Sequence, residues 1–442
     1  MVMTMRRREL VLGAVLGAAL PGCAPSRRDI ELGAELDGLV NDPLQPLSGL
    51  SVLVQRQGRT VYEAQFGRRY IGAAAGGKGD LPVTADTLFR VASLSKAALG
   101  LGVMRLVDAG QLDLEADLSE ALGYKLRNPL YPDVSLNARM LLSHTSSITD
   151  EGGIAVPPGQ TMQQLLLAAG SKCWARTRPG SFFQYSNLCY GLLAGLVERV
   201  SGLRFDAFMQ QQVLGPLGMQ GSYDAAQLTP AQLANLATLY RKQGTDERWN
   251  AAGPWVAQAD DFHAAPPRPQ AGLEGYVLGS NGSLFGPQGR LRTRVRDLGA
   301  IAAMFNAGGL LPSGQRYLAK ASVDAMTIER WRFDEATANG DNFGGEFQAW
   351  GLGLQHYIDR SGPHFGDRLV AQGGLQAWGH LGFSYGLQAG LMFEPASQSA
   401  IVYVIGGHSA DPNENRGRFS SYPDWEEQLH QRLWDAALRQ PG

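Results

Sequence analysis

Hydrophobic and polar residues alternate at both ends of this chain, whereas the middle carries a helical pattern. The stretch GLSVLVQRQGRTVYEAQFG, residues 49–67, alternates apolar and polar positions on either side of Gln57-Gly58. This alternation predicts two strands joined by a tight turn. Strand-like runs return near the other end, at Leu387–Pro395 and Ser399–Gly407. Between them, TMQQLLLAAG and YGLLAGLVERVSG have helical spacing and are separated by loops rich in proline and glycine.

A long apolar helix is predicted soon after the first pair of strands. The segment FRVASLSKAALGLGVMRLVDAG, residues 89–110, places Leu99, Val103, Leu106 and Val107 on one helical face. Near the end of the chain, WEEQLHQRLWDAAL has the spacing of a closing helix. Strands at both ends with helices between them predict an α/β (α+β) domain interrupted by an insertion.

The predicted domain limits follow from this pattern. Residues 29–117 and 272–442 form the α/β domain, and residues 118–271 form a mainly helical insertion domain. The long polar stretch at 244–276, rich in aromatic residues and proline, is interpreted either as a lid over a site or as a surface loop.

Composition narrows the classes of partner. The 442 residues are 44% hydrophobic and 18% charged, the net charge is −2, and no basic block follows residue 30. A nucleic-acid partner is therefore not expected. The seven histidines show no HExxH or similar metal-ligand spacing, so no metal and no other cofactor is predicted.

The first residues have the features of an export signal. Three arginines at 6–8 precede an apolar run from Leu10 to Leu20, which is too short for a permanent membrane span. Residues 1–28 are therefore predicted to be a leader, and the protein to be exported to the periplasm or cell envelope. The arginines resemble a twin-arginine signal, and Leu20-Pro21-Gly22-Cys23 resembles a lipoprotein cleavage site. A membrane tether through a lipidated Cys23 is left open, as is pairing of Cys173 with Cys189.

Ser93 and Lys96 are the first candidates for chemistry. Three residues apart on a helix, they lie on one face about 5 Å apart. A serine at a helix N-terminus lies where the helix dipole favours developing negative charge. Serine needs a neighbouring base, and a lysine in a dry pocket can act as that base or tune another group. The alternative interpretation is a helix cap followed by a solvated lysine.

Two further short motifs carry suitable side chains. Tyr185-Ser186-Asn187 precedes an apolar helix, and a tyrosine beside an ammonium can share a proton and deprotonate Ser93. Asn187 offers an amide to Lys96 or to a substrate carbonyl. Otherwise Tyr185 is a core residue and Asn187 a helix cap.

His380-Leu381-Gly382 is predicted to lie on a strand, where a glycine permits close approach of a ligand. The edge of this strand offers a backbone N–H as an oxyanion donor, with His380 as a polar wall. The alternative is that His380 is purely structural.

Together, the order and spacing of these motifs resemble a known family. Ser93-Leu94-Ser95-Lys96, Tyr185-Ser186-Asn187 and His380-Leu381-Gly382 match Ser-x-x-Lys, Tyr-x-Asn and Lys/His-x-Gly of the serine β-lactamase and penicillin-recognising superfamily. The chain is most similar to its class C-like branch, which includes family VIII carboxylesterases and D-amino-acid-specific peptidases. LLSHTSSI, at 141–148, is close to the family's Leu-Leu-Thr-His-Thr-Ser-Gly. GRLRTRVRDLGAI, at 289–301, is similar to its Gly-Gly-Leu-x-Ser-Thr-x-x-Asp-Leu.

The resemblance covers about residues 48–408 and implies a fold and a set of roles. The implied fold is β-lactamase/transpeptidase-like, with an antiparallel sheet flanked by helices. Ser93 would be the acylated nucleophile, Lys96 its proton partner, and Tyr185 both the general base and the acid for the leaving group. Asn187 would position Lys96 and the substrate.

The resemblance also implies an oxyanion hole. Its donors would be the backbone N–H groups of Ser93 and Phe383, the latter directly after Gly382. His144 matches a family motif and is expected to be structural.

Two departures from the motif alter the predicted substrate. His380 replaces the usual lysine, and Leu381 replaces a threonine that would bind a substrate carboxylate. A neutral imidazole and an aliphatic side chain recognise a carboxylate poorly. The predicted function is therefore a serine hydrolase of short-chain carboxylic esters or of D-amino-acid peptides and amides, including cell-wall peptides. The alternatives are a β-lactamase and a slowly acylating penicillin-binding or sensing envelope protein.

A rival nucleophile lies in the same segment. Gly382-Phe383-Ser384-Tyr385-Gly386 satisfies Gly-x-Ser-x-Gly, the nucleophile elbow of α/β-hydrolases. That motif needs a strand before the serine and a helix after it, whereas the residues after Ser384 are strand-like. Ser93 is therefore the predicted nucleophile.

Overall fold

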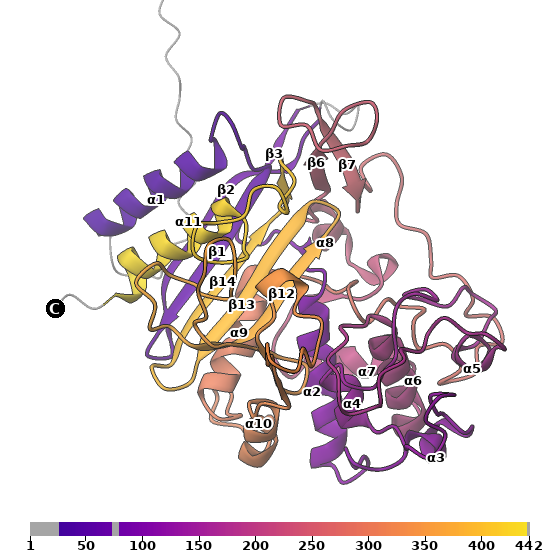
Figure 1. The fold of residues 1–442 in the computed structure, drawn as a ribbon. Helices are drawn as coiled ribbons and strands as arrows, with labels where there is room; N and C mark the ends of the chain where they lie inside the picture. Colours follow the sequence, from indigo (N-terminus) through magenta and orange to yellow (C-terminus); the bar gives the residue numbers. More distant parts are fainter. Residues whose placement is uncertain (1–25, 73–78, 440–442) are drawn as a thin grey trace, which may run out of the picture.

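A nine-stranded antiparallel sheet forms the centre of the computed structural model, which describes residues 26–72 and 79–439 (Figure 1). The strand order is β3-β2-β1-β14-β13-β12-β11-β10-β9. The bounds are β1 Gly49–Arg56, β2 Arg59–Tyr70, β3 Leu81–Pro82, β9 Trp331–Arg332, β10 Ala349–Trp350, β11 Gln355–Tyr357, β12 Ala377–Ser384, β13 Leu387–Glu394 and β14 Ser399–Ile405. Strands from the two ends of the chain therefore pair at the middle of the sheet, where β1 lies beside β14.

The predicted first pair of strands is confirmed as the hairpin β1–β2. Gln57 and Gly58 connect the strands with φ angles of 53° and 72°. Both central residues of a tight hairpin turn of this kind need a positive φ, which glycine adopts without strain. The predicted strands near residues 387–395 and 399–407 are likewise observed, as β13 and β14.

Helices cover both faces of the sheet. On one face, α1 (Arg27–Val40) and α11 (Asp424–Leu433) pack together over a buried cluster that includes Leu36, Tyr403 and Leu429. On the other face, α9 (Val295–Asn306) packs against β1, β13 and β14. The predicted closing helix is α11, followed by a π-helical turn at Trp434–Leu438.

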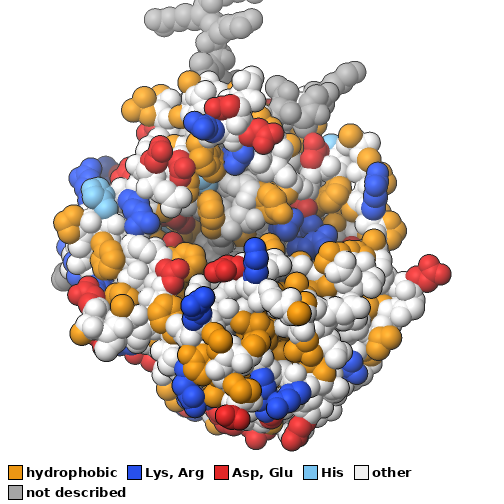
Figure 2. Space-filling view, turned by 45° about the vertical axis from the view of Figure 1, so that its right-hand side comes forward, with side chains coloured by type: hydrophobic (Ala, Val, Ile, Leu, Met, Phe, Trp, Pro, Cys, Tyr) orange, Lys and Arg blue, Asp and Glu red, His pale blue; other side chains and the backbone are white. Residues whose placement is uncertain are grey.

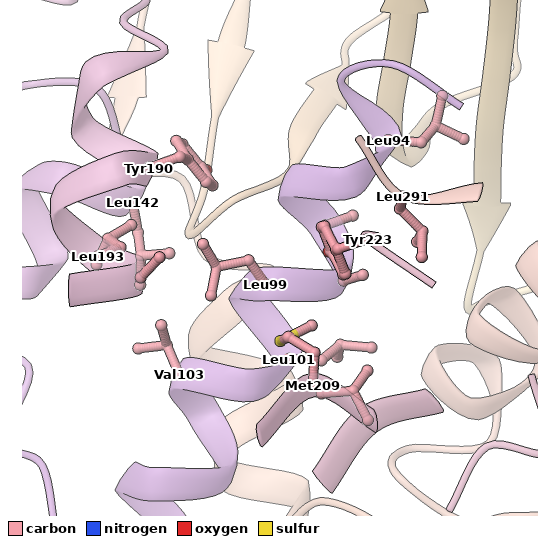
Figure 3. Packing of buried hydrophobic residues seen from close by; sticks show 14 of the residues in the cluster. Leu94, Leu99, Leu101, Val103, Leu142, Tyr190, Leu193, Met209, Tyr223 and Leu291 are labelled. Carbon is pink, nitrogen blue, oxygen red and sulfur yellow. The ribbon is translucent and has the colours of Figure 1, made fainter. Parts of the chain in front are cut away.

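The predicted apolar helix is α2 (Leu94–Asp108), which is buried on almost all sides. Leu99, Leu101 and Val103 point toward side chains from several other elements, including Tyr190 and Met209 (Figure 3). At Gly102 an added Cβ would lie 3.1 Å from both the Met209 sulfur and the Phe208 ring. A glycine at position 102 therefore allows α7 (Phe205–Met209) to pack close to α2.

The remaining helices gather mostly beside α2, away from the sheet (Figure 1). They are α3 Leu118–Leu122, α4 Ala138–Leu142, α5 Met162–Leu167, α6 Leu188–Ser201, α7 Phe205–Met209, α8 Pro230–Ala234 and α10 Lys320–Met326. A π-helical turn lies at Gln210–Leu214, and 3₁₀ turns lie at Ala225–Gln227 and Phe343–Gly345.

Two small sheets connect the region 118–271 to the rest of the chain. One has the order β15-β6-β7, with bounds Gly407–His408, Leu239–Lys242 and Trp255–Ala259. The other has the order β4-β8-β5, with bounds Phe89–Arg90, Arg292–Thr293 and Gly221–Ser222. This region thus holds α3–α8 and also contributes three strands to sheets shared with other segments.

The predicted leader lies largely outside the described residues, which begin at Ser26. Ser26 caps α1, so Arg27 and Arg28 already belong to that helix. Cys173 and Cys189 are both buried free thiols and do not pair with each other. In the part of the chain that the structure describes, no helix has the length and apolar character needed to cross a membrane.

Candidate active site

Ser93 lies at the N-terminus of α2, directly after a strained residue. Ala92 has a φ of 46°, a left-handed conformation that costs energy for any residue with a Cβ. The N–H of Val91 is fixed by the Leu291 carbonyl, and those of Leu94 and Ser95 are bound within the turn. The Ser93 N–H has no backbone acceptor among the described residues, so it is free to donate to a ligand.

Lys96 connects two of the predicted motifs, Ser-x-x-Lys and Tyr-x-Asn, through its amine. Its Nζ donates to Ser93 Oγ at 3.0 Å, to Asn187 Oδ1 at 2.8 Å and to the Gln288 carbonyl at 3.0 Å. The side chain is fully buried, and burial lowers the pKa of Lys96 to about 7. An amine with this pKa is partly unprotonated at neutral pH and can accept a proton from the serine.

Tyr185 lies on the other side of Ser93, among aromatic rings. Its ring stacks on His144 at 4.4 Å and on Phe347 at 5.4 Å, and the Lys96 ammonium lies 4.8 Å from its centre. Burial raises the pKa of the Tyr185 hydroxyl, and its hydrogen bond to Ser93 opposes this only in part. The phenol is therefore the favoured form of Tyr185.

Asp150 organises the Tyr-x-Asn motif, and the sequence alone did not indicate this residue. Its carboxylate accepts hydrogen bonds from Ser186 Oγ at 2.8 Å, from the backbone N–H groups of Asn187 and Leu188 at 2.9 and 3.0 Å, and from Asn187 Nδ2 at 2.9 Å. This last bond orients the Asn187 amide so that its oxygen faces Lys96. The negative charge also opposes the lowering of the Lys96 pKa.

His144 supports the same segment. Its Nδ1 accepts a hydrogen bond from the Ser186 N–H at 3.1 Å, and burial holds its pKa well below the usual value. A neutral imidazole with its backbone at a φ of 55° thus fixes the position of Tyr185 and Ser186. Its contacts agree with the structural role expected from the sequence.

The motif His380-Leu381-Gly382 lies on β12, as predicted. The paired part of β11 reaches only Gly379 of β12, so residues 380–384 form an edge that β11 does not cover. An added Cβ at Gly382 would lie 2.6 Å from Leu94 and 2.7 Å from the Val91 carbonyl, so only glycine lets β12 approach the start of α2. Phe383, half-exposed, follows on this edge.

His380 is buried beside the reacting groups. Its Nδ1 lies 2.6 Å from the Leu381 carbonyl, and its ring lies 6.3 Å from that of Tyr185. Burial and the nearby Lys96 charge lower the pKa of His380 to about 3. The imidazole therefore stays neutral at physiological pH, as assumed from the sequence.

Ser93, Tyr185, Asn187 and residues 380–383 line a cavity of about 740 Å³. Aromatic side chains from Phe343, Phe347 and Phe383 form part of its wall, together with Leu381 and Ile154. Charged side chains also line it, namely Arg90, Arg290, Arg416, Glu346 and Glu426. Figure 2 shows a hollow in the middle of one face, with Lys and Arg side chains gathered along one side of it. A second cavity, of about 800 Å³ and lined by Asp86 and Gln220, contains none of the candidate residues.

Six of the seven predicted site residues line this cavity, and the buried Lys96 binds two of them, Ser93 and Asn187. The rival nucleophile Ser384 lines the cavity as well. Ser384 ends a strand and is followed by a turn and the strand β13, so the strand–helix context of a nucleophile elbow is missing. Residues 244–276, interpreted as a possible lid, contribute no side chain to the lining. Residues near 343–347 and 412–416 contribute to the lining instead.

Comparison with known proteins gives matches along most of the chain. The esterase EstB of Burkholderia gladioli is 32% identical over 223 residues, which are 46% of this chain and 54% of that protein. The D-alanyl-D-alanine-carboxypeptidase/endopeptidase AmpH of Escherichia coli is 30% identical over 142 residues, 30% of this chain and 36% of that protein. The chain thus spans about half the length, or less, of these two curated relatives.

Solved structures match over a longer range. The D-amino acid amidase from Ochrobactrum anthropi, complexed with L-phenylalanine, has a TM-score of 0.62 at 19% identity and covers 93% of this chain and 98% of its own. The octameric penicillin-binding protein homologue from Pyrococcus abyssi has a TM-score of 0.62 at 21% identity, covering 92% of this chain and 76% of its own. The predicted β-lactamase/transpeptidase-like fold is therefore confirmed.

The family model described as Beta-lactamase matches residues 36–419, a range that contains all three motifs and most residues of the cavity wall. The chain therefore belongs to the Beta-lactamase family.

Proposed function

We propose that the protein is a serine hydrolase that forms an acyl-enzyme on Ser93 and cleaves short-chain carboxylic esters or D-amino-acid peptides and amides. The observation that carries the proposal is the position of Lys96. Its buried Nζ lies within hydrogen-bond distance of Ser93 Oγ and is held there by Asn187 and Gln288. A lysine without a carboxylate contact, beside a serine in a cavity, has the properties of a base that activates a nucleophile.

The proposed acylation starts from a neutral Lys96 and a protonated Tyr185. Lys96 thereby takes the role of base in acylation, which the family resemblance assigned to Tyr185, because burial lowers the pKa of the amine and raises that of the phenol. Ser93 Oγ attacks the substrate carbonyl while its proton passes to Lys96 Nζ, and the carbonyl electron pair moves onto oxygen. When the tetrahedral intermediate collapses, the bond to the leaving group breaks and Tyr185 donates its proton to that group. Lys96 then returns a proton to the tyrosine, so the protons balance over the step.

The N–H groups of Ser93 and Phe383 are proposed to stabilise the oxyanion. The first lies at the start of α2, where the helix dipole adds to its effect, and the second lies on the uncovered edge of β12. A water molecule, deprotonated by the same groups, would then attack the acyl-enzyme and release Ser93.

Several observations favour esters or amides over β-lactams. His380 remains neutral and Leu381 is aliphatic, so this part of β12 offers no cation or hydroxyl to a substrate carboxylate. Relatives named as an esterase, a carboxypeptidase/endopeptidase and a D-amino acid amidase support a substrate with a carboxylic ester or amide bond.

The test is hydrolysis of p-nitrophenyl acetate and butyrate, with nitrocefin assayed in parallel. Ser93→Ala should remove all ester turnover while the circular dichroism spectrum and melting temperature stay unchanged. Ser384→Ala is the matched control and should keep the wild-type rate. Ester turnover that survives in Ser93→Ala would refute the assignment of the nucleophile.

The other outcomes separate the alternative functions. Rapid nitrocefin turnover would identify a β-lactamase. Stoichiometric labelling of Ser93 by a fluorescent penicillin, with no turnover of esters or of D-alanine amide, would identify a slowly acylating penicillin-binding protein.

We also propose that residues 1–28 direct export to the periplasm or cell envelope. The supporting features are the arginines at 6–8, the apolar run and Cys23. Mass spectrometry of the protein isolated from cell fractions would give the mature N-terminus, and Cys23→Ser would test a lipid anchor. A full-length protein recovered from the cytoplasm would contradict the proposal.

A further inference from the structure

Three arginines on the cavity wall, Arg90, Arg290 and Arg416, have no carboxylate within salt-bridge distance among the described residues. Arg416 lies near enough to the Glu346 carboxyl to lower its pKa, whereas no such carboxyl of the cavity wall acts on Arg90 or Arg290. Arg90 and Arg290 both line the cavity that contains Ser93, and neither forms an ion pair within the described residues, although 15 other basic side chains do. Both are partly buried, and desolvation lowers their pKa values. Partly buried guanidinium groups without a counter-ion are costly, unless a ligand supplies the negative charge.

Neutral groups hold both guanidinium groups in place. Arg90 Nε donates to the Gly289 carbonyl at 3.1 Å, and its Cζ lies 4.7 Å from the centre of the Tyr385 ring. Arg290 Nη1 donates to the Leu284 carbonyl and to Gln270 Oε1, both at 3.2 Å. Arg90 also forms a side-chain hydrogen bond to Tyr385. The bonds of Arg290 use only Nη1, so its other N–H donors stay available.

The nearby carboxylates do not neutralise this pair. Arg292, adjacent in space, takes both oxygens of Asp260 in a bidentate ion pair at 2.7 and 2.8 Å. Asp224, which also acts on Arg290 electrostatically, uses its side chain to accept from the Ala226 N–H. Arg90, Arg290 and Arg292 therefore have two carboxylates nearby. Asp260 is paired with Arg292, and Asp224 caps a 3₁₀ turn.

The pair is also close to the reacting groups. Arg90 is three residues before Ser93, and its acceptor Gly289 directly follows Gln288, whose carbonyl binds Lys96. Arg290 stands where the family motif Gly-Gly-Leu has its second glycine, so this chain departs from the motif there. Arg416 and Glu346 also line the cavity, and the Arg416 charge lowers the pKa of the Glu346 carboxyl.

We propose that Arg90 and Arg290 bind a carboxylate carried by the substrate, so that the preferred substrates are anionic esters or amides. This inference rests on the proposed hydrolase function. Guanidinium groups bind carboxylates in a bidentate manner, with charge-assisted hydrogen bonds. The two arginines are not at position 381, where the family motif has a threonine. Leu381 packs against the buried cluster under α11, whereas Gly382 lies against Leu94 and Val91, next to Arg90 in the chain.

The experiment compares two esters that differ by one charge, mono-p-nitrophenyl adipate and its methyl ester. The wild-type kcat/KM should be higher for the anionic ester by about ten- to hundredfold, the effect of one or two charge-assisted hydrogen bonds. This preference should fall as ionic strength rises. In Arg290→Gln and in Arg90→Gln, the ratio of the two kcat/KM values should approach one.

Two controls test whether the variants fold and whether the preference depends on Arg90 and Arg290 in particular. Arg416→Gln removes the third arginine that lines the cavity and should keep the preference for the anionic ester. Melting temperatures identify a variant that fails to fold. If Arg90→Gln fails, Arg290→Gly, which restores the residue of the family motif, carries the test.

Binding to Ser93→Ala by isothermal titration separates this inference from the proposed function. The inactive variant should bind the anionic ester about ten- to hundredfold more tightly than the methyl ester, even if no ester is turned over. Equal affinity for the two esters would overturn the inference, as would a preference that depends on Arg416 alone. If the wild type hydrolyses neither ester, the proposed hydrolase function is refuted. The binding experiment still decides whether Arg90 and Arg290 recognise a carboxylate.

Discussion

Lys96 and Arg292 are both buried basic side chains, but their surroundings stabilise them in opposite ways. The Arg292 guanidinium forms two hydrogen bonds to the Asp260 carboxylate, and both side chains are almost fully buried. Lys96 is equally buried, yet its three acceptors are a hydroxyl, an amide oxygen and a backbone carbonyl. The Asp150 carboxylate forms no hydrogen bond to Lys96. It binds the Asn187 amide, and its negative charge raises the pKa of Lys96.

The difference shows how a buried charge is used. A cation paired with a carboxylate keeps its proton and fixes the chain around it, here joining β8 to the segment at residue 260. A cation surrounded by neutral acceptors loses its proton more easily because no negative charge compensates for its desolvation. Arg292 is therefore suited to a structural role and Lys96 to proton transfer.

The largest expected effect comes from removing the Lys96 amine. Lys96→Met should lower kcat by about 10⁴-fold, because the base that receives the Ser93 proton is lost. The melting temperature should stay the same or rise, since a buried charge is replaced by an apolar side chain of similar size. Ester kinetics and differential scanning fluorimetry measure both, with the exposed Lys125→Met as control. A clear loss of stability would mean that Lys96 is mainly structural.

The opposite result is expected at the paired cation. Asp260→Asn leaves Arg292 buried without a counter-ion and should lower the free energy of unfolding by about 3–5 kcal/mol. Urea denaturation followed by circular dichroism measures this change. The double variant Asp260→Leu with Arg292→Met should recover much of the loss, because no unpaired charge remains. If the single variant loses less than about 1 kcal/mol, the pair contributes little to the fold.

The pH dependence tests the lowered pKa of Lys96. Below pH 7 the amine is protonated and cannot take the serine proton, so kcat/KM should fall by about tenfold per pH unit. Stability should change with the same group: between about pH 7 and the pKa of the unfolded chain, the unfolded state binds more protons, and stability should rise with pH. Lys96→Met should flatten that rise. A rate that is flat from pH 5 to 8 would contradict a neutral Lys96 as the base.

The smallest effect concerns Asp150, a positioning residue. Asp150→Asn removes a negative charge that holds the Lys96 pKa up, so the acidic limb of the pH profile should move to lower pH. The maximal kcat should fall by roughly tenfold, because the Asn187 amide loses its acceptor. A purely structural role would lower activity without moving the limb. The surface variant Asp324→Asn is the control.

Local patterns account for what the sequence predicted well. The hairpin β1–β2, the helix α2, the strands β12–β14 and the serine–lysine pair all depend on periodicity or on spacing within a few residues. The meeting of Ser93, Tyr185, Asn187 and His380 was anticipated only through the resemblance to a family.

The residues that were missed depend on long-range contacts. Asp150 lies 37 residues before Asn187, and Gln288 lies 192 residues after Lys96 and contributes only a carbonyl. Arg90 and Arg290 are 200 positions apart and meet through Gly289 and the cavity wall. No periodicity or short motif marks such positions, because the fold alone brings them together.

The pairing of β1 with β14 also has a consequence for how the molecule folds. The second strand partner of β1 lies some 350 residues further along the chain, and Lys96 needs the Gln288 carbonyl and the β12 edge nearby before its site is complete. Contacts so distant in sequence close slowly, and the partly made sheet leaves an apolar edge at β1 exposed meanwhile. The site therefore cannot be complete before the residues of β12 have been synthesised and have joined the sheet, so Ser93 cannot be activated while most of the chain is still on the ribosome.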